Sequence, residues 1–181
     1  MTFLEKFTQD QRDLMVRLPY RIGLWISQSD TAGGSEADER ERQALSNILH
    51  AFAEDLFGSE NLQYIMSETI RQKSNWPSWS KDVELVPGEC ADAITLMRDH
   101  GEPKDVKALK NHLMEIAEAV ALAFHEEDSR TSVFSAVGLY VSHLFSKNKR
   151  RQRGRSFGEF LNVSTSEREA LNVIVDALES V

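Results

Sequence analysis

The chain has 181 residues, enough for one domain with a sizeable core. Hydrophobic residues make up 41% and charged residues 28%, which is typical of a soluble globular protein and excludes a disordered chain. No apolar run approaches the roughly 20 residues that span a bilayer, and Cys90, the only cysteine, excludes an intrachain disulfide and a cysteine-rich zinc site. Because residues 1–13 contain acids where a secretory signal is apolar, we expect a cytoplasmic protein that is not an integral membrane protein.

The formal charge of −8 is unevenly distributed. The segment KNKRRQRGRS, residues 147–156, holds six of the 21 basic residues and no acid, so the rest of the chain carries 15 basic against 29 acidic residues, a net of −14. The six are Lys147, Lys149, Arg150, Arg151, Arg153 and Arg155. An acidic body with one basic loop lacks the basic face of a nucleic-acid-binding domain.

Apolar residues recur at helical spacing along nearly the whole chain. Pro19 suits the first turn of a helix, so we expect one helix to end before it and another to start there. The predicted helices cover residues 8–17, 19–29, 45–56, 62–70, 87–99, 104–126, 133–145 and 171–178. No alternating strand pattern is present. The sequence therefore predicts an all-α protein, a compact bundle of about eight helices.

Two helix starts have the pattern of a capping box. In Asp38–Glu41 and in Ser164–Glu167, an Asp or Ser is followed three residues later by a Glu that can bond back to it. Acids in a first helical turn also suit the helix dipole. Capping accounts for these four residues without a ligand, and we favour it.

Asp30 and the two glycines that follow suggest a second interpretation. The span from Asp30 to Glu41 is twelve residues, the length of an EF-hand loop, but Ala32, Gly34 and Ser35 stand where that loop needs oxygen ligands and then a glycine. This is not an EF-hand. A looser site for a divalent cation such as calcium, formed by Asp30, Asp38, Glu41 and loop carbonyls, remains as the alternative to capping.

The same residues resemble the tellurite-resistance TerB-like family, in a longer, uncharacterised branch. The similar features are LWISQSD at 24–30, Gly33-Gly34, and Glu41 four residues before Leu45, followed later by IAEAVALAFHEED at 116–128 and NVSTSEREAL at 162–171. The resemblance implies a single all-helical domain, 1–181, built from two helix–loop–helix halves at about 8–74 and 104–181. It also implies a second, weaker cation site formed by Glu126, Glu127, Asp128 and Glu167. The departures are the missing Asp-Gly pair and the insertion at 129–161.

The candidate enzyme motifs in the sequence are incomplete. His125-Glu126-Glu127-Asp128-Ser129 is not a zincin because its fifth residue is Ser. His112, Glu115 and Glu118 share a helix face, as ligands do in di-iron bundles, but the Glu-x-x-His order is absent and a solvated polar face is the favoured interpretation. Cys90 has no histidine near it in the sequence, and His50, His100 and His143 stand alone. Two interpretations apply to Trp25, Trp76 and Trp79: they line a pocket, or they belong to the core. We favour the core, where large aromatic side chains are more often found.

The leading functional hypothesis is a non-enzymatic interaction or cation-binding module in bacterial tellurite or metal stress, with a protein partner. The alternative is a regulatory adaptor that contacts nucleic acid or an anionic membrane through residues 147–155. A hydrolase is the least favoured reading.

Overall fold

A computed structural model describes residues 2–29, 35–53, 59–125 and 165–180, and within these ranges it contains helices and no strand. The α-helices are α1 (Gln9–Ser27), α2 (Ser35–Ala53), α3 (Glu60–Arg71), α4 (Trp76–Trp79), α5 (Val86–His100), α6 (Pro103–His125) and α9 (Thr165–Glu179). Three short 3-10 segments, η1 (Phe3–Lys6), η2 (Lys73–Asn75) and η3 (Val83–Leu85), join them. The all-α prediction is confirmed. Of the eight predicted helices, the one over residues 133–145 lies outside the described residues.

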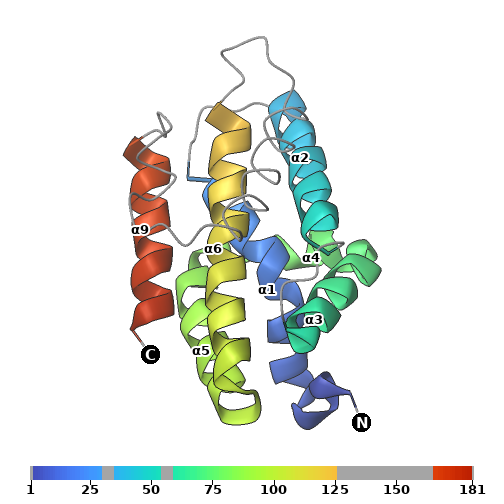
Figure 1. Ribbon diagram of the computed structural model, residues 1–181. Coiled ribbons are helices and arrows are strands. Elements are labelled where there is room, and N and C mark those ends of the chain that lie inside the picture. Colours follow the sequence, from blue (N-terminus) through green and yellow to red (C-terminus); the bar gives the residue numbers. More distant parts are fainter. Residues whose placement is uncertain (1, 30–34, 54–58, 126–164, 181) are drawn as a thin grey trace.

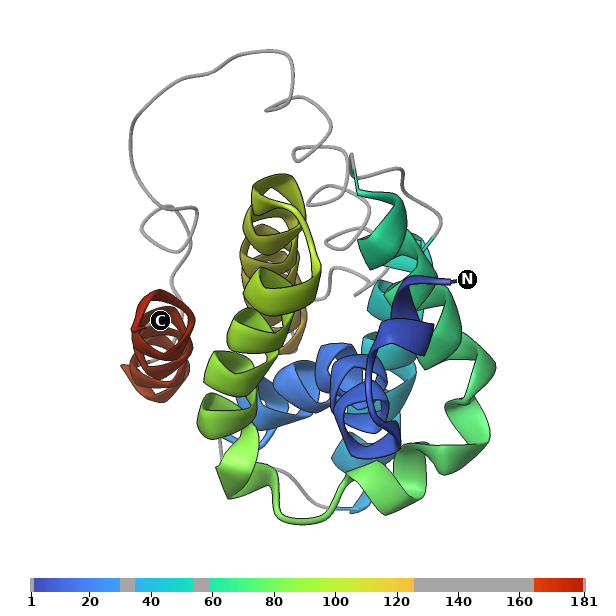
Figure 2. The same cartoon turned by 90° about the horizontal axis from the view of Figure 1, so that it is seen from below.

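Helix α1 lies at the centre of the bundle. It contacts α6 and α5 on one side and α3 and α2 on the other, as Figures 1 and 2 show. Its middle is accordingly buried nearly all round, from Met15 to Ile26, with only Arg17 and Trp25 partly exposed in that stretch. Such a distribution is typical of a helix surrounded by others rather than lying on a surface.

Gly23 lets α1 and α2 approach closely. A Cβ atom placed there would lie 2.3 Å from Cδ1 of Leu45, which is buried in α2, and 3.4 Å from a methyl group of Val120 in α6. Small residues at a helix crossing permit this short separation.

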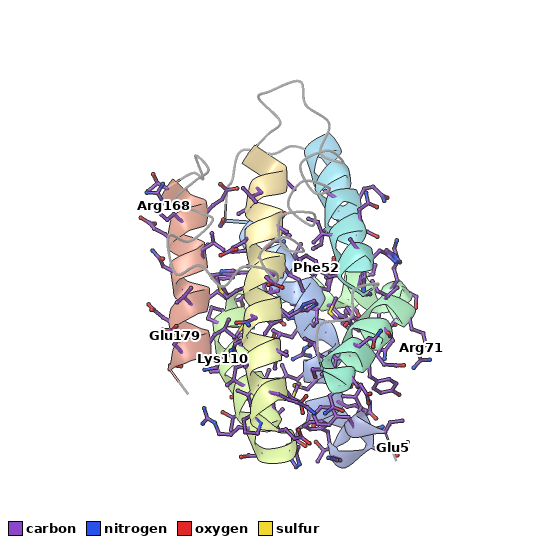
Figure 3. The ribbon with its side chains drawn as sticks, in the orientation of Figure 1. Glu5, Phe52, Arg71, Lys110, Arg168 and Glu179 are labelled. Atoms are coloured by element: carbon purple, nitrogen blue, oxygen red, sulfur yellow. The ribbon has the colours of Figure 1, made fainter. Side chains whose placement is uncertain are left out.

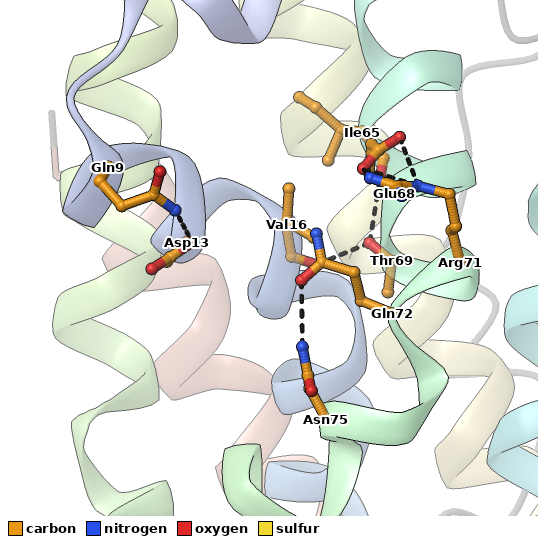
Figure 4. A network of polar contacts seen from close by, with 9 residues as sticks. All are labelled: Gln9, Asp13, Val16, Ile65, Glu68, Thr69, Arg71, Gln72 and Asn75. Atoms are coloured by element: carbon orange, nitrogen blue, oxygen red, sulfur yellow. Dashed lines mark hydrogen bonds and ion pairs between the residues drawn. The ribbon is translucent and has the colours of Figure 1, made fainter.

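The predicted break at Pro19 is wrong, because α1 continues through it. A proline inside a helix removes one backbone hydrogen bond and costs roughly 3 kcal/mol. Large apolar side chains on both sides of Pro19 are buried in the same core, and each contributes about 1.5–3 kcal/mol, which outweighs that cost. Close to the proline, the hydroxyl of Thr69 on α3 lies 2.6 Å from the Val16 carbonyl and 3.0 Å from that of Ile65 (Figure 4).

Helix α9 packs against α5 and α6, with its most extensive contacts to α5. Its buried apolar residues include Leu171, Ile174 and Leu178, as the periodicity predicts. The contact of α9 with α5 is larger than its contact with the long helix α6. Figure 3 shows Arg71, Arg168 and Glu179 on the outside of the bundle, whereas Phe52 lies between α2 and α6.

The structure bears differently on the two helix starts predicted at Asp38 and at Ser164. Helix α2 begins at Ser35, so Asp38 lies inside the helix and cannot be its N-cap; the prediction was wrong by about one turn. Helix α9 begins at Thr165, which puts Ser164 at the predicted cap position, although Ser164 itself lies outside the described residues. A capping box that the sequence analysis missed starts α1, where Thr8 and Gln11 exchange backbone-to-side-chain bonds of 2.9 and 3.4 Å.

Candidate functional site

Most of the predicted cation ligands lie where the structure describes no side chain. Asp30, Glu126, Glu127 and Asp128 lie outside the described residues, and for Asp38 and Glu41 only the helical backbone is described. Glu167 is described: it lies in the first turn of α9 and is 2% exposed. The sites at Asp30 and at Glu126 therefore stay predictions.

The helix ends that flank these residues share one end of the bundle. The N-terminal ends of α2 and α9 and the C-terminal end of α6 all lie at the top in Figure 1. Among the described residues, no group of three or more His, Cys, Asp or Glu side chains gathers in a way that could hold a metal ion.

The basic loop lies entirely outside the described part of the chain. This applies to Lys147, Lys149, Arg150, Arg151, Arg153 and Arg155. Docking of this loop on an anionic surface stays a prediction. None of the described helices is long and apolar enough to cross a membrane.

The interpretation of His112 as part of a solvated face was wrong. Its side chain is 1% exposed, and its ring lies edge-on to Phe52 with 5.0 Å between the ring centroids. Burial lowers the pKa of His112 to about 4, so the imidazole is neutral at physiological pH. Glu115 Oε2 lies 3.9 Å from its Nδ1. The sequence pattern failed here because α2 covers this part of α6, which periodicity within one helix cannot show.

Cys90 is fully buried in α5. Burial, and secondarily the charge of Glu89, raises the pKa of its thiol to about 12. The group is therefore a thiol at neutral pH and has the character of a core residue.

A cavity of about 350 Å³ opens where α1, α2 and the η2–α4 segment meet. We call it the Trp76 pocket. Among the described residues, two cationic side chains and no carboxylate line it: these residues are Tyr20, Arg42, Gln43, Ser46, Lys73, Trp76, Pro77 and Ser80. This is the lower end of the size range of small-molecule sites.

One wall of the Trp76 pocket is a rigid aromatic pair. The rings of Tyr20 and Trp76 stack with centroids 4.6 Å apart, and the indole N–H donates to the Thr69 carbonyl at 3.1 Å. Ser80 lies 3.1 Å from the Tyr20 hydroxyl and donates to the Trp76 carbonyl at 3.0 Å. These polar groups are thus satisfied within the protein and form a preorganised wall.

The opposite side of the pocket carries the charge. The ammonium of Lys73 donates to the Ser46 hydroxyl at 2.9 Å and lies 5.5 Å from the ring centroid of Trp76, within cation–π range. Lys73 therefore connects η2 to α2 and is held at the pocket, not extended into solvent. Arg42 and Gln43 lie about one turn before Ser46 on α2, and they complete the polar rim of the pocket.

A buried ion pair fixes the turn that follows α4. Arg21, 4% exposed, donates to Glu89 at 2.6 Å and to the carbonyl oxygens of Trp79, Lys81 and Asp82 at 2.6 to 2.8 Å. The same turn contains the one non-glycine residue with positive φ among those described, Asp82 at 50°. Since Arg21 follows Tyr20 on α1 and the turn includes Ser80, this network positions the aromatic wall of the pocket.

A second cavity of about 280 Å³ lies between η1, α1 and α3. Its charged groups include both signs, and several are already paired, as Arg71 is with Glu68 and Asp13 with Gln9 (Figure 4). Its described lining therefore mixes both signs and does not select a ligand by charge as clearly as a cavity with charges of one sign.

Sequence reasoning did not find the Trp76 pocket. It left open whether the tryptophans line a pocket or belong to the core, and Trp76 does both, being 6% exposed and part of the pocket lining. Lys73 and Arg42 carry no motif and are 31 positions apart in the sequence. The folded chain, in which Lys73 of η2 donates to Ser46 of α2, brings them to the same cavity.

No protein-family model matches the chain, and comparisons with curated proteins and with solved structures gave no match either. The site is therefore interpreted from its own geometry.

Proposed function

We propose that this protein is a non-enzymatic helical binding module that takes a small anionic ligand in the Trp76 pocket. One observation carries the proposal: the ammonium of Lys73 is held at a concave site by the Ser46 hydroxyl, and none of the described residues that line this site is a carboxylate. In a protein with a formal charge of −8, an ammonium held at a cavity favours an anionic ligand there.

The position of Lys73 supports the same conclusion. Its ammonium is held by Ser46 and by the Trp76 ring, so little side-chain entropy is lost when an anion binds to it. The pocket wall is itself held by the Arg21 network, which reduces the cost of ordering further. Preorganisation of this kind increases affinity without adding contacts.

Calorimetric titration with a panel of small carboxylates, phosphates and sulfate tests the proposal. Binding of at least one of these anions is expected, with a substantial loss in Lys73→Met, which keeps most of the side-chain length but removes the charge. Lys107→Met, an exposed position on α6, is the matched control and should bind as the wild type does. Absence of binding by every anion in the panel contradicts the proposal.

Cation binding at the top end of the bundle is the second candidate. The carboxylate of Glu167 is buried at the start of α9, and the ends of α2 and α6 that flank the predicted ligands lie at that same end. Burying a carboxylate is costly unless hydrogen bonds, a helix N-terminus or a cation stabilise its charge. The TerB-like assignment and a role in tellurite or metal stress belong to this candidate.

Millimolar calcium, magnesium and manganese separate the cation hypothesis from capping alone. A cation that binds only the native state raises the melting temperature. Glu41→Gln should remove such a shift if Glu41 is a ligand, since the amide has no negative charge. Melting curves that none of the three ions shifts would leave the acids with a structural role.

A further inference from the structure

We propose that the cavity between η1, α1 and α3 binds a free α-amino acid. This second site is separate from the Trp76 pocket, and we call it the Arg12 cavity. The charged side chains of its described lining are the cations Arg12 and Arg71 and the carboxylates Glu5, Asp13 and Glu68. The proposal follows from which of these charges have an ionic partner within the protein and which do not.

One ion pair is closed within the lining of the Arg12 cavity. Arg71 donates to the carboxylate of Glu68, which lies on the same helix, α3 (Figure 4). In the part of the chain that the structure describes, Arg12, Glu5 and Asp13 form no ion pair. One cation and two carboxylates therefore line the same cavity without neutralising one another.

The guanidinium of Arg12 is the group that would receive the carboxylate of the ligand. It is partly buried on α1, and one of its terminal nitrogens donates to the Phe7 carbonyl at 3.2 Å. Its Nε is buried and has no hydrogen-bond partner among the described residues. A charge that is partly removed from water without a counter-charge is costly, and a ligand carboxylate lowers that cost. The N–H groups that remain on the terminal nitrogens form a fork that fits a carboxylate.

Asp13 and Glu5 would receive the ammonium group of the ligand. Oδ1 of Asp13 accepts from the Gln9 amide at 2.7 Å (Figure 4), and Oε2 of Glu5 accepts from the backbone N–H of Thr2 at 2.9 Å. These donors are uncharged, so they orient the two carboxylates but leave their charge in place. The second oxygen of each carboxylate remains available, and an ammonium group has three N–H groups to donate.

The mixture of signs disfavours a ligand that carries only one of them. A simple carboxylate is repelled by Glu5 and Asp13, and a simple amine is repelled by Arg12. An α-amino acid carries its carboxylate and its ammonium group on the same carbon atom. Arg12 and Asp13 are neighbours on α1 and line the same cavity, so one small molecule can reach both.

The size and the uncharged part of the lining fit a single amino acid. A volume of about 280 Å³ lies just below the range of typical small-molecule sites, which suits a ligand of few heavy atoms. Leu4, Val16 and the ring of Tyr64 supply apolar surface for the ligand side chain. In a peptide the two charged ends lie on different residues, so a free amino acid is the better match.

Calorimetric titration of the full chain with L-alanine and L-leucine tests the proposal. Propionate and 4-methylpentanoate are the matched compounds that lack the ammonium group, and ethylamine and 3-methylbutylamine are those that lack the carboxylate. At least one amino acid should bind, and it should bind at least about tenfold more tightly than either of its two analogues, since each analogue loses one charge-assisted contact. The proposal is overturned if neither amino acid binds, or if an analogue binds as tightly as its amino acid.

Two variants link the binding to the named residues. Arg12→Gln and Asp13→Asn should each lower the affinity for the amino acid at least about tenfold. Arg98→Gln on α5 and Asp10→Asn on α1 are the matched controls, because both positions are exposed and lie outside the lining of the Arg12 cavity. Circular dichroism and the melting temperature establish that each variant folds. Unchanged affinity in folded Asp13→Asn and Arg12→Gln would refute the assignment.

Lys73→Met separates this site from the Trp76 pocket. Because Lys73 lines the Trp76 pocket and not the Arg12 cavity, Lys73→Met should bind the amino acid as the wild type does. If Lys73→Met loses the binding and Arg12→Gln keeps it, the amino acid occupies the Trp76 pocket through its carboxylate. In that case this inference fails while the proposed function stands.

Discussion

Glu89 and Asp105 are two buried acids that the fold accommodates in different ways. Both lie in the first turn of a helix, Glu89 in α5 and Asp105 in α6, where the helix dipole favours negative charge. Glu89, 8% exposed, accepts from Arg21 at 2.6 Å and from Arg17 at 2.7 Å. Asp105, 1% exposed, instead accepts three hydrogen bonds from uncharged groups.

The donors to Asp105 are Ser59 at 2.7 Å, Asn61 at 2.9 Å and the backbone N–H of Glu102 at 2.9 Å. Burial acts to raise the pKa of Asp105, but the hydrogen bonds from Glu102, Ser59 and Asn61 outweigh it, with a contribution from Lys104, and the pKa is lowered overall. A buried carboxylate is therefore stabilised in this protein either by a cation or by well-placed dipoles. The two solutions differ in what happens when one partner is removed.

Removal of Arg21 should have the largest effect. Arg21→Met leaves Glu89 with the partly exposed Arg17 and deprives three backbone carbonyls of their donor, so we expect the free energy of unfolding to fall by about 3–5 kcal/mol. Urea denaturation at pH 7 measures this.

A double variant sharpens the test of the ion pair. The variant Arg21→Met/Glu89→Leu removes both the buried guanidinium and the carboxylate that it neutralises, so no buried charge is left uncompensated. This double variant should be more stable than Arg21→Met alone. A double variant that is less stable than the single one would show that Glu89 contributes through other contacts.

His112 extends the comparison to a buried group that is neutral when folded. Its pKa is about 4 in the folded state and about 6.5 when unfolded, so the unfolded chain takes up the proton first as the pH falls. The contribution to stability is complete above pH 6.5 and is lost between pH 6.5 and pH 4, by at most about 3 kcal/mol. In His112→Leu this part of the decrease should disappear from unfolding curves at pH 7, 6, 5 and 4.5. Parallel curves for the two proteins would contradict the burial argument.

Asp105 should act in a lower pH range. Because its folded pKa is lowered, the stability it contributes is complete above the unfolded pKa of about 3.9 and is lost as the pH falls through the folded value. At pH 7 we expect Asp105→Asn to lower the free energy of unfolding by about 1–3 kcal/mol, since an amide N–H would face one of the donors. The difference from the wild type should shrink below pH 4. A difference that stays the same from pH 7 to pH 3 would count against this account.

An exposed ion pair is the control for the predictions on the buried groups Arg21, His112 and Asp105. Arg71 pairs with Glu68 on the surface of α3, where its side chain is 71% exposed. Water and salt screen such a pair, so Arg71→Ala should leave the urea midpoint unchanged within experimental error. A clear shift would mean that exposure is a poor guide to the energetics of ion pairs in this protein.

The helices were predictable where the apolar pattern was long and uninterrupted. The predicted range 104–126 agrees with α6, and 87–99 agrees with α5, because each buries one continuous face. The failures occurred at local signals that tertiary packing overrides. Pro19 reads as a helix start, but burial on both sides of it keeps α1 continuous.

The candidate pocket was much less predictable. The predicted cation ligands were chosen from local spacing within one connection, whereas the Trp76 pocket collects residues from α1, α2, η2 and α4. Of its lining residues, sequence analysis singled out only Trp76. Arg21 and Glu89 likewise carry no local signal, because they are 68 positions apart in the sequence.

The sequence by itself determined the all-helical class and most of the faces that are buried, because periodicity depends only on neighbours within three or four residues. Tertiary structure alone decided that α9 packs mainly against α5, that His112 is covered by α2, and that Lys73 and Arg42 line the same cavity. Such pairings depend on which helix faces meet. Many residue pairs distant in the sequence are chemically compatible, and only close packing of the whole chain selects among them.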